Sequence, residues 1–252
     1  KQRQAQAVFS GIRAWVDESS QEFIDDLMLS VRQDGDDPAF RSASGGRIYH
    51  SLAVSGGGEN GAFGAGILYG WSKSGARPKF KLVTGISTGA LIAPFALLGV
   101  AQDERLKEVY TRIHAGDIYK SLNIYSVFTG EALVDSMPLK ALVKRYFSKE
   151  VIAQIAQAHL RGQRLYIGTT NLDAEQLVVW NMGKIAAIGN DRSDQLFRDI
   201  LVASASIPGA FPPVYIDVVV GDERYDEMHV DGGLKAQLFF YTGTRNLKSL
   251  TG

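Results

Sequence analysis

Residues 80–99 read FKLVTGISTGALIAPFALLG, and this stretch decides the fold class. The part before Gly85 has the length and composition of a buried strand, and the part from Ser87 onward predicts a helix that is apolar nearly all round. The junction is a G-x-S-x-G motif, in which Gly85 and Gly89 leave room for a tight strand-to-helix turn. Such a turn exposes the hydroxyl of Ser87 at the carboxyl edge of a sheet, in front of the positive end of a helix. Serine is also a preferred helix N-cap, so a purely structural role is the alternative.

The order of elements around this stretch indicates an α/β fold. Upstream, residues 47–56 predict a strand that runs into a glycine turn, and residues 61–75 predict a helix. Strands that alternate with helices form parallel pairs with crossover connections. Downstream, the patterns predict helices at 138–147, 151–160 and 193–204, and strands at 164–172, 176–182, 214–220 and within 227–233. We therefore expect a three-layer α/β/α fold around a central, mostly parallel sheet.

Two amphipathic segments precede this domain. Each places its apolar residues on one helical face, so residues 1–46 are expected to form an N-terminal helical extension that packs on a main domain of residues 47–252. Docking of these helices on a lipid surface is the alternative. The apolar residues are Val8, Phe9, Ile12, Trp15 and Val16 in the first segment, and Phe23, Ile24, Leu27, Met28 and Val31 in the second.

Composition argues against several classes of function. Lys and Arg together number 27, as do Asp and Glu, and the resulting zero net charge argues against nucleic-acid binding. The chain has no cysteine, which removes thiol catalysis, disulfides and thiolate metal sites. Its four histidines lack the H-E-x-x-H spacing of zinc hydrolases, so we expect no metal site and no cofactor. No apolar run is long enough to predict a membrane-spanning helix.

A second glycine-rich turn, GGGENG, lies between the upstream strand and helix. Gly56, Gly57 and Gly58 free successive backbone N–H groups to converge on an anion, and Gly61 closes the motif. Beside a nucleophilic serine these amides would form an oxyanion hole. The same letters match the dinucleotide fingerprint G-x-G-x-x-G, but residues 79–85 lack the acidic residue that binds the ribose. The oxyanion interpretation is therefore favoured.

A third motif, Asp231-Gly232-Gly233, follows the last predicted strand. An aspartate at a strand end could lie against the serine hydroxyl and take its proton during attack. The structural alternative is an Asp-Gly turn with no catalytic role.

His229 leaves a second arrangement open. It lies two residues before Asp231, so on a strand both side chains would face the same side. We interpret His229 as a structural residue near the site. The alternative is a Ser–His–acid triad of the α/β-hydrolase kind, with Asp217 or Asp222 as the acid.

Taken in this order, the motifs resemble the patatin-like phospholipase family. GGGENG, GISTG and DGG are joined by two further similar stretches, TTNLDAEQLVVWNMG at 169–183 and ASASIPGAFPPV at 203–214, and the similarity covers about residues 47–240. The resemblance implies a patatin-like fold and a serine–aspartate dyad that needs no histidine, metal or cofactor. One departure is Asn60, because the family usually has Arg or Lys there. The family domain usually continues well beyond the aspartate, so we expect part of it to be either missing from this chain or disordered.

The resemblance also implies a role for each motif residue. Ser87 would be the nucleophile, and Asp231 would be the general base and later the general acid. The amides of Gly57 and Gly58, with Gly56 assisting, would hold the oxyanion. Gly85 and Gly89 would form the turn around the serine, and Gly61, Gly232 and Gly233 would support their motifs.

We therefore expect a serine lipid acyl hydrolase, a phospholipase A or esterase, that cleaves carboxylic esters through an acyl-enzyme. Its partners would be a lipid ester and, transiently, a membrane or micelle surface, with no nucleic acid; the sequence does not indicate an oligomeric state. The alternatives are a non-catalytic lipid-binding module of the same fold, a triad esterase, and an acyltransferase on the same site. The abrupt start KQRQAQ fits a trimmed leader, and many bacterial relatives by resemblance are exported, which favours the cell envelope or secretion. Candidates to line the acyl side, each also a candidate core residue, are Phe63, Ile67, Leu91, Pro94, Phe95 and Phe211.

Overall fold

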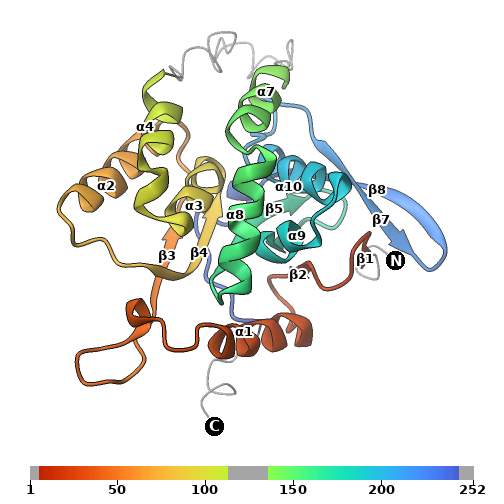
Figure 1. The fold of residues 1–252 in the computed structure, drawn as a ribbon. Helices are drawn as coiled ribbons and strands as arrows, with labels where there is room; N and C mark the ends of the chain where they lie inside the picture. Colours follow the sequence, from red (N-terminus) through yellow and green to blue (C-terminus); the bar gives the residue numbers. More distant parts are fainter. Residues whose placement is uncertain (1–5, 113–135, 244–252) are drawn as a thin grey trace.

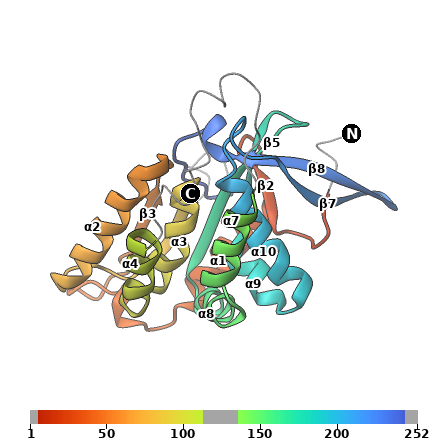
Figure 2. The ribbon, with the colours of Figure 1, turned by 90° about the horizontal axis from the view of Figure 1, so that it is seen from above.

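The fold is built around strand β4, whose seven residues are all buried. A computed structural model describes residues 6–112 and 136–243 and places them in one mixed sheet with helices around it (Figures 1 and 2). The strands are β1 (Gln6–Ala7), β2 (Arg13–Trp15), β3 (His50–Val54), β4 (Phe80–Ile86), β5 (Arg164–Asn171), β6 (Gln176–Asn181), β7 (Val214–Val220) and β8 (Glu223–Asp231). The helices are α1 (Gln21–Gln33), α2 (Gly61–Lys73), α3 (Thr88–Leu98), α4 (Asp103–Arg112), α7 (Met137–Tyr146), α8 (Lys149–Leu160), α9 (Met182–Ile188) and α10 (Asp191–Ser204).

Most neighbouring strands of this sheet are antiparallel. Within the described part of the chain, only β3–β4 and β4–β5 pair in parallel, whereas β5 pairs antiparallel with both β6 and β8, and β7 with β8. The expectation of a mostly parallel sheet is therefore wrong, although the α/β class is confirmed. The reason lies in two connections: residues 172–175 and 221–222 are too short to cross over the sheet, so each joins its strands as a hairpin.

Strand β5 carries β4 and β8 one after the other on the same edge, because β6 occupies its other edge. The ladder of β4 ends with Ile86 opposite Gly168. The ladder of β8 ends with Asp231 opposite Thr169, the next residue of β5. Since β4 runs parallel to β5 and β8 runs antiparallel to it, the carboxyl ends of β4 and β8 meet at this point.

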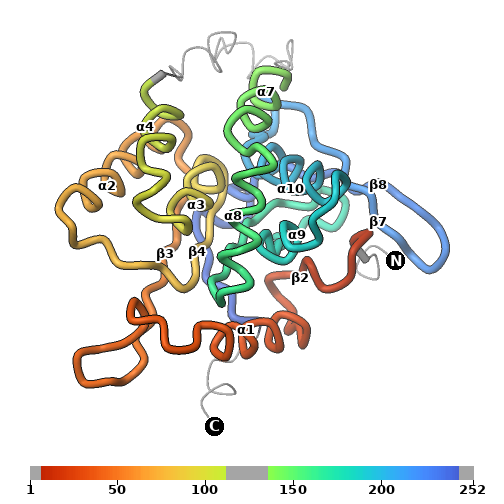
Figure 3. Tube along the Cα trace, in the orientation of Figure 1, coloured from red at the N-terminus to blue at the C-terminus, as the bar shows by residue number. Residues whose placement is uncertain are grey.

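The first amphipathic segment forms strands, so its predicted helix is wrong. β1 pairs with β7 and β2 pairs with β6, which lie towards opposite edges of the sheet. The short stretch of residues 8–12 joins the two strands, so the sheet curls until one segment reaches both edges (Figure 3). Ile12 and Trp15 are buried in this arrangement. Because apolar spacing reports burial and not conformation in so short a segment, it misled the prediction. The division of the chain at about residue 47 stays a prediction.

The second amphipathic segment forms helix α1, as its spacing predicts. Ser20 caps this helix by accepting a hydrogen bond from the amide of Phe23. Two ion pairs with little exposure connect α1 and its C-cap to the sheet: Arg164 Nε lies 2.6 Å from a carboxylate oxygen of Asp26, and Lys81 Nζ lies 3.0 Å from one of Asp34. Each pair is costly to break, because one partner would remain as an uncompensated buried charge.

Alternate residues of the central strands face two hydrophobic clusters. Val83 and Ile167 belong to the large cluster that also holds the buried faces of α3, α7, α8, α9 and α10. Leu82 and Tyr166 belong to a smaller cluster on the other face, with residues of α1 and of the C-terminal segment near Phe239. Figure 2 shows the helices of the large cluster gathered mainly on one side of the sheet, while α1 and the C-terminal segment contribute to the smaller cluster on the other face. Both faces of the central strands are therefore covered, as buried parallel strands require.

Helix α3 begins so close to β3 that only glycine fits at its second residue. A Cβ atom on Gly89 would lie 2.3 Å from the carbonyl oxygen of Val54 and 2.7 Å from that of Ser55. Both neighbours are backbone atoms, so neither can move aside without shifting β3 or α3.

We expect Gly89→Ala to lower the free energy of unfolding by about 3 kcal/mol, the upper part of the usual range for overpacking. Gly66→Ala is the matched control, because a Cβ atom there meets no atom within 4 Å and α2 should gain about 0.5–1 kcal/mol of helix propensity. Urea denaturation followed by circular dichroism measures both values. Equal stability of the two variants would contradict the close packing of α3 on β3.

Candidate active site

Ser87 occupies a strained turn between β4 and α3. Its backbone angles are φ 56° and ψ −128°, in a region that residues with a side chain rarely adopt. Gly85 permits the turn, since a Cβ atom there would lie 2.5 Å from the carbonyl oxygen of Gly89. The hydroxyl makes no capping hydrogen bond to α3, so helix capping does not explain this serine.

The Ser87 hydroxyl donates a hydrogen bond to Asp231. Its Oγ lies 2.6 Å from Asp231 Oδ2, and both residues are almost fully buried. The other carboxylate oxygen accepts a hydrogen bond of 2.7 Å from the amide of Gly233. Gly232 lets the chain turn closely past β5, because a Cβ atom there would lie 2.7 Å from the carbonyl oxygen of Gly168. A serine with an oriented carboxylate as its neighbour is an arrangement that can transfer a proton during nucleophilic attack.

Burial raises the pKa of the Asp231 carboxyl above its ordinary value of 3.8. The hydrogen bonds from Ser87 and from the amide of Gly233 act in the opposite direction, because they stabilise the ionised form. A raised pKa makes the carboxylate a better base than an exposed aspartate.

The end of helix α10 holds both residues in place. The amide of Ser87 donates to Ser204 Oγ at 3.0 Å, and the Ser204 hydroxyl donates to the carbonyl oxygen of Gly168 at 2.7 Å. The amide of Asp231 donates to the carbonyl oxygen of Ser206 at 2.9 Å. These three bonds tie the serine turn, β5 and the end of β8 to one helix terminus. The sequence did not identify Ser204 as part of the site, because its role depends on contacts between distant segments.

The glycine loop lies beside Ser87, but its three glycines are not equivalent. Gly56 donates its amide to the carbonyl oxygen of Gln237 at 3.0 Å, so its predicted part in the oxyanion hole is corrected: this N–H is already used within the protein. A Cβ atom on Gly56 would lie 3.1 Å from that of Ser87, which makes close approach the reason for this glycine. Gly57 and Gly58 have φ angles of 150° and 56°, and among the described residues their amides have no backbone acceptor.

These residues surround a pocket of about 280 Å³ with Ser87 and Asp231 in its wall. Its lining comes from the three glycines of the loop and from the stretches that follow α10 and β8. Its apolar lining comes from Ile207, Pro208 and Leu234.

The family model of patatin-like phospholipases matches residues 52–241 of the 252. The chain belongs to the patatin-like phospholipase family. Membership supports a lipid acyl hydrolase in general terms. No curated protein matches the chain. Among solved structures, VipD from Legionella pneumophila is similar, with a TM-score of 0.49 and 15% identity over 82% of this chain. The chain spans 50% of the length of VipD.

The residues expected to line the acyl side of the site differ from those that line the pocket at Ser87 in the structure of this patatin-like chain. None of the six expected residues lines the pocket. Leu91, Phe95 and Phe211 are buried core residues, whereas Phe63 and Ile67 point to solvent. Ile207 and Pro208 belong to the stretch ASASIPGAFPPV, which is similar to the family in sequence. The sequence did not indicate that these two residues line the pocket.

His229 belongs to a buried network on the same face of β8 as Asp231. Its ring nitrogens lie 2.9 Å from Thr169 Oγ1 and 3.2 Å from Glu227 Oε2. Arg13 of β2 pairs with the same carboxylate, at 2.5 and 3.2 Å. Burial lowers the pKa of His229, and the hydrogen bond to Glu227 only partly offsets that effect. Both ring nitrogens are therefore engaged away from Ser87, which favours the structural interpretation of His229.

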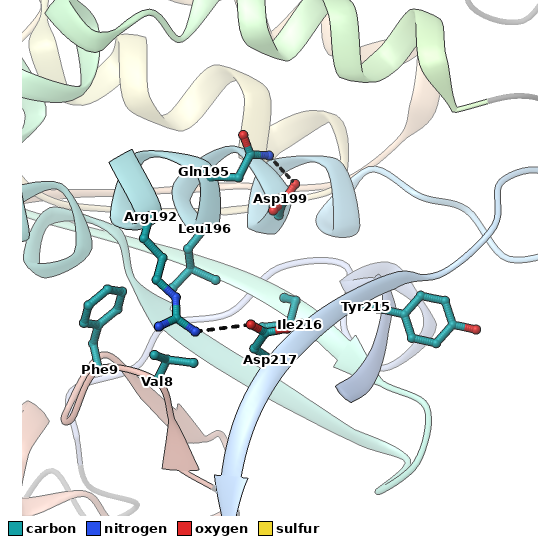
Figure 4. Close-up of a pocket in the computed structure, with 9 residues that line it drawn as sticks. All are labelled: Val8, Phe9, Arg192, Gln195, Leu196, Asp199, Tyr215, Ile216 and Asp217. Carbon is teal, nitrogen blue, oxygen red and sulfur yellow. Dashed lines mark hydrogen bonds and ion pairs between the residues drawn. The ribbon is translucent and has the colours of Figure 1, made fainter. Parts of the chain in front are cut away.

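The acids suggested for a triad lie elsewhere. Figure 4 shows Asp217 in a separate pocket of about 140 Å³, with its carboxylate 3.2 Å from Arg192. Asp222 lies in the exposed turn between β7 and β8, at the opposite end of β8 from Asp231. Within residues 6–112 and 136–243, no three His, Asp or Glu side chains are grouped as metal ligands.

The pKa of Asp231 predicts how the reactivity of Ser87 depends on pH. Labelling of Ser87 by a fluorophosphonate should slow as pH falls through this pKa, because a protonated carboxyl cannot accept the serine proton. The midpoint should lie above 3.8, since burial raises this pKa. The labelling rate is measured by mass spectrometry, with circular dichroism confirming the fold at each pH. Asp231→Asn should label slowly at every pH; a midpoint at or below 3.8, or an unchanged profile in this variant, would exclude Asp231 as the base.

Proposed function

We propose that this chain is a serine lipid acyl hydrolase, a phospholipase A or esterase, in which Ser87 is the nucleophile and Asp231 the general base. The observation that carries the proposal is the hydrogen bond of 2.6 Å from Ser87 Oγ to Asp231 Oδ2. The raised pKa of Asp231, the open amides of the glycine loop and the family support it.

In the acylation step, Ser87 Oγ forms a bond to the ester carbonyl carbon while its proton passes to Asp231 Oδ2. The carbonyl π electrons move to the oxygen, and the amides of Gly57 and Gly58 hold this oxyanion. The positive end of α3, which begins next to Ser87, adds to that stabilisation. When the intermediate collapses, the bond to the ester oxygen breaks and Asp231 returns the proton to the departing alcohol.

Deacylation repeats these steps with water. Asp231 takes a proton from a water molecule whose oxygen attacks the acyl carbon, and the intermediate collapses to release a fatty acid. In this collapse the bond between Ser87 Oγ and the acyl carbon breaks, and Ser87 Oγ recovers its proton from Asp231. The burial of both residues shelters each proton transfer from bulk water.

Three variants separate the dyad from a triad. Ser87→Ala should abolish hydrolysis of a medium-chain fatty acyl ester, and Asp231→Asn should lower kcat by about 10²–10⁴-fold, the usual contribution of a positioned base. His229→Gln should retain most of the activity, because an amide can bond to both Thr169 and Glu227. Initial rates of fatty acid release measure all three variants.

Each variant needs a folded protein, which near-ultraviolet circular dichroism verifies. A folded His229→Gln variant without activity would contradict the dyad. No Ser87-dependent turnover of any ester would favour a non-catalytic lipid-binding module. Acyl transfer to added alcohols in place of hydrolysis would make the chain an acyltransferase.

We further propose that the face of α2 beside the glycine loop contacts the lipid surface. Phe63 and Ile67 are 74% and 50% exposed, and Trp71 continues the same stripe one turn later. α2 starts at Gly61, directly after the glycine loop, and forms one margin of the molecule in Figures 1 and 2. Among the described residues, no helix is both long and apolar enough to cross a bilayer. Contact would therefore come from the apolar stripe lying on the surface.

The double variant Phe63→Ser/Ile67→Ser should release fatty acid from lipid vesicles about tenfold more slowly, because each side chain loses part of the 1.5–3 kcal/mol available from full burial. Turnover of a water-soluble short-chain ester should stay unchanged. Val100→Ser is the matched control, since Val100 is 63% exposed but follows the far end of α3 from Ser87. An equal loss on both substrates, or an equal loss in the control, would contradict this surface.

A further inference from the structure

The pocket at Ser87 contains one polar side chain that the proposed reaction does not use. The pocket is lined by Gly56, Gly57, Gly58, Ser87, Ile207, Pro208, Asp231, Gly233, Leu234 and Gln237. Only three of these residues have a polar side chain, and two of them, Ser87 and Asp231, bond to each other. The third is Gln237, whose exposed carboxamide has no hydrogen-bond partner within residues 6–112 and 136–243.

The backbone fixes Gln237 next to both catalytic groups. Its carbonyl oxygen accepts the amide of Gly56 at 3.0 Å, which joins the segment after β8 to the glycine loop. Its side-chain Oε1 lies 3.5 Å from the position of a Cβ atom on Gly56, and that position is 3.1 Å from Ser87 Cβ. Its Nε2 lies 3.9 Å from the corresponding position on Gly233, which is 3.0 Å from Asp231 Oδ1. The carboxamide therefore lies beside the dyad, in the wall of the pocket that would hold a bound ester.

The lining of the pocket favours an uncharged group at this position. Among the described residues that line the pocket, Asp231 is the only charged one, and its carboxylate repels a phosphate. Residue 60 of the glycine loop is an asparagine, which carries no charge. An anionic group brought next to Ser87 would lose water without gaining an ion pair, which is costly. A carboxamide, in contrast, can both donate to and accept from a hydroxyl group.

We propose that Gln237 is a specificity-determining residue that binds a free hydroxyl next to the scissile ester, so that the preferred substrates are uncharged glycerol esters rather than esters with an adjacent phosphate. The inference rests on the proposed hydrolase function and adds the substrate class. It assigns to the segment after β8 the recognition of the leaving alcohol, while the glycine loop holds the carbonyl oxygen.

Three esters with the same acyl chain test the proposal. Monooleoylglycerol carries free hydroxyls, propyl oleate lacks them, and oleoyl lysophosphatidic acid carries a phosphate. In mixed micelles of a nonionic detergent, the unaltered protein should have a kcat/KM for monooleoylglycerol about five- to tenfold above that for propyl oleate, as one neutral hydrogen bond provides. Its kcat/KM for lysophosphatidic acid should be the lowest of the three.

In Gln237→Leu, which keeps the backbone carbonyl and the size of the side chain, the ratio between monooleoylglycerol and propyl oleate should fall to about one. Gln237→Met should do the same, so the result does not depend on one replacement. Lys235→Met is the matched control, because Lys235 is exposed on the same segment outside the pocket, and its ratio should not change. Stoichiometric labelling of Ser87 by a fluorophosphonate verifies an intact site in every variant.

Other outcomes overturn the proposal. An unaltered protein that hydrolyses lysophosphatidic acid fastest, or that treats the two neutral esters alike, excludes the assigned substrate class. A ratio that survives in Gln237→Leu and Gln237→Met excludes the assigned residue. In both cases Ser87-dependent hydrolysis of propyl oleate would leave the hydrolase proposal standing. If none of the esters is hydrolysed in a Ser87-dependent way, both proposals fail together.

Discussion

The candidate site depends on one constraint of the sheet: β4 and β8 share a single edge of β5 and run towards each other along it. Their last paired residues, Ile86 and Asp231, lie opposite neighbouring residues of β5. A strand can continue only until it reaches the next one on the same edge, so both must end here. The serine that follows β4 and the aspartate that ends β8 are thereby brought within hydrogen-bond distance. Small errors of register in either strand would separate them by a full residue.

The geometry around this junction is crowded, and the crowding explains its glycines. Gly85 and Gly89 face each other across the turn, and Gly232 passes the backbone of β5. Ser87 keeps a strained backbone conformation because the hydrogen bond from its amide to Ser204 Oγ and the packing of α3 hold it there. Strain of this kind persists only when the surroundings over-determine it. As a result of this conformation, the hydroxyl makes no hydrogen bond to α3 and faces the carboxylate of Asp231 and the pocket.

The N-terminal segment contributes to the strand that carries the aspartate. Arg13 of β2 reaches across the curled sheet to Glu227 of β8, and Glu227 bonds to His229. The hydrogen bonds of Arg13 and His229 hold the pKa of Glu227 below its ordinary value, although burial raises it. Glu227, His229 and Asp231 are alternate residues of β8, so their side chains lie on the same face of the strand. Residues outside the range matched by the family model therefore stabilise the strand on which the proposed base stands.

The sequence by itself determined the α/β class, most of the helices and strands, and the three motifs that meet at the site. These features are local, because the glycines and the apolar runs specify backbone geometry over a few residues. It failed at the first amphipathic segment, where a few apolar residues fit a buried strand as well as a helix, and it missed that the short connections at 172–175 and 221–222 exclude parallel pairing. Only the tertiary structure decided that Gly56 uses its amide on Gln237, that His229 turns to Glu227, and that Ile207 and Leu234 line the pocket. Each of these contacts joins segments or orients side chains by three-dimensional packing, which no local pattern of residues encodes.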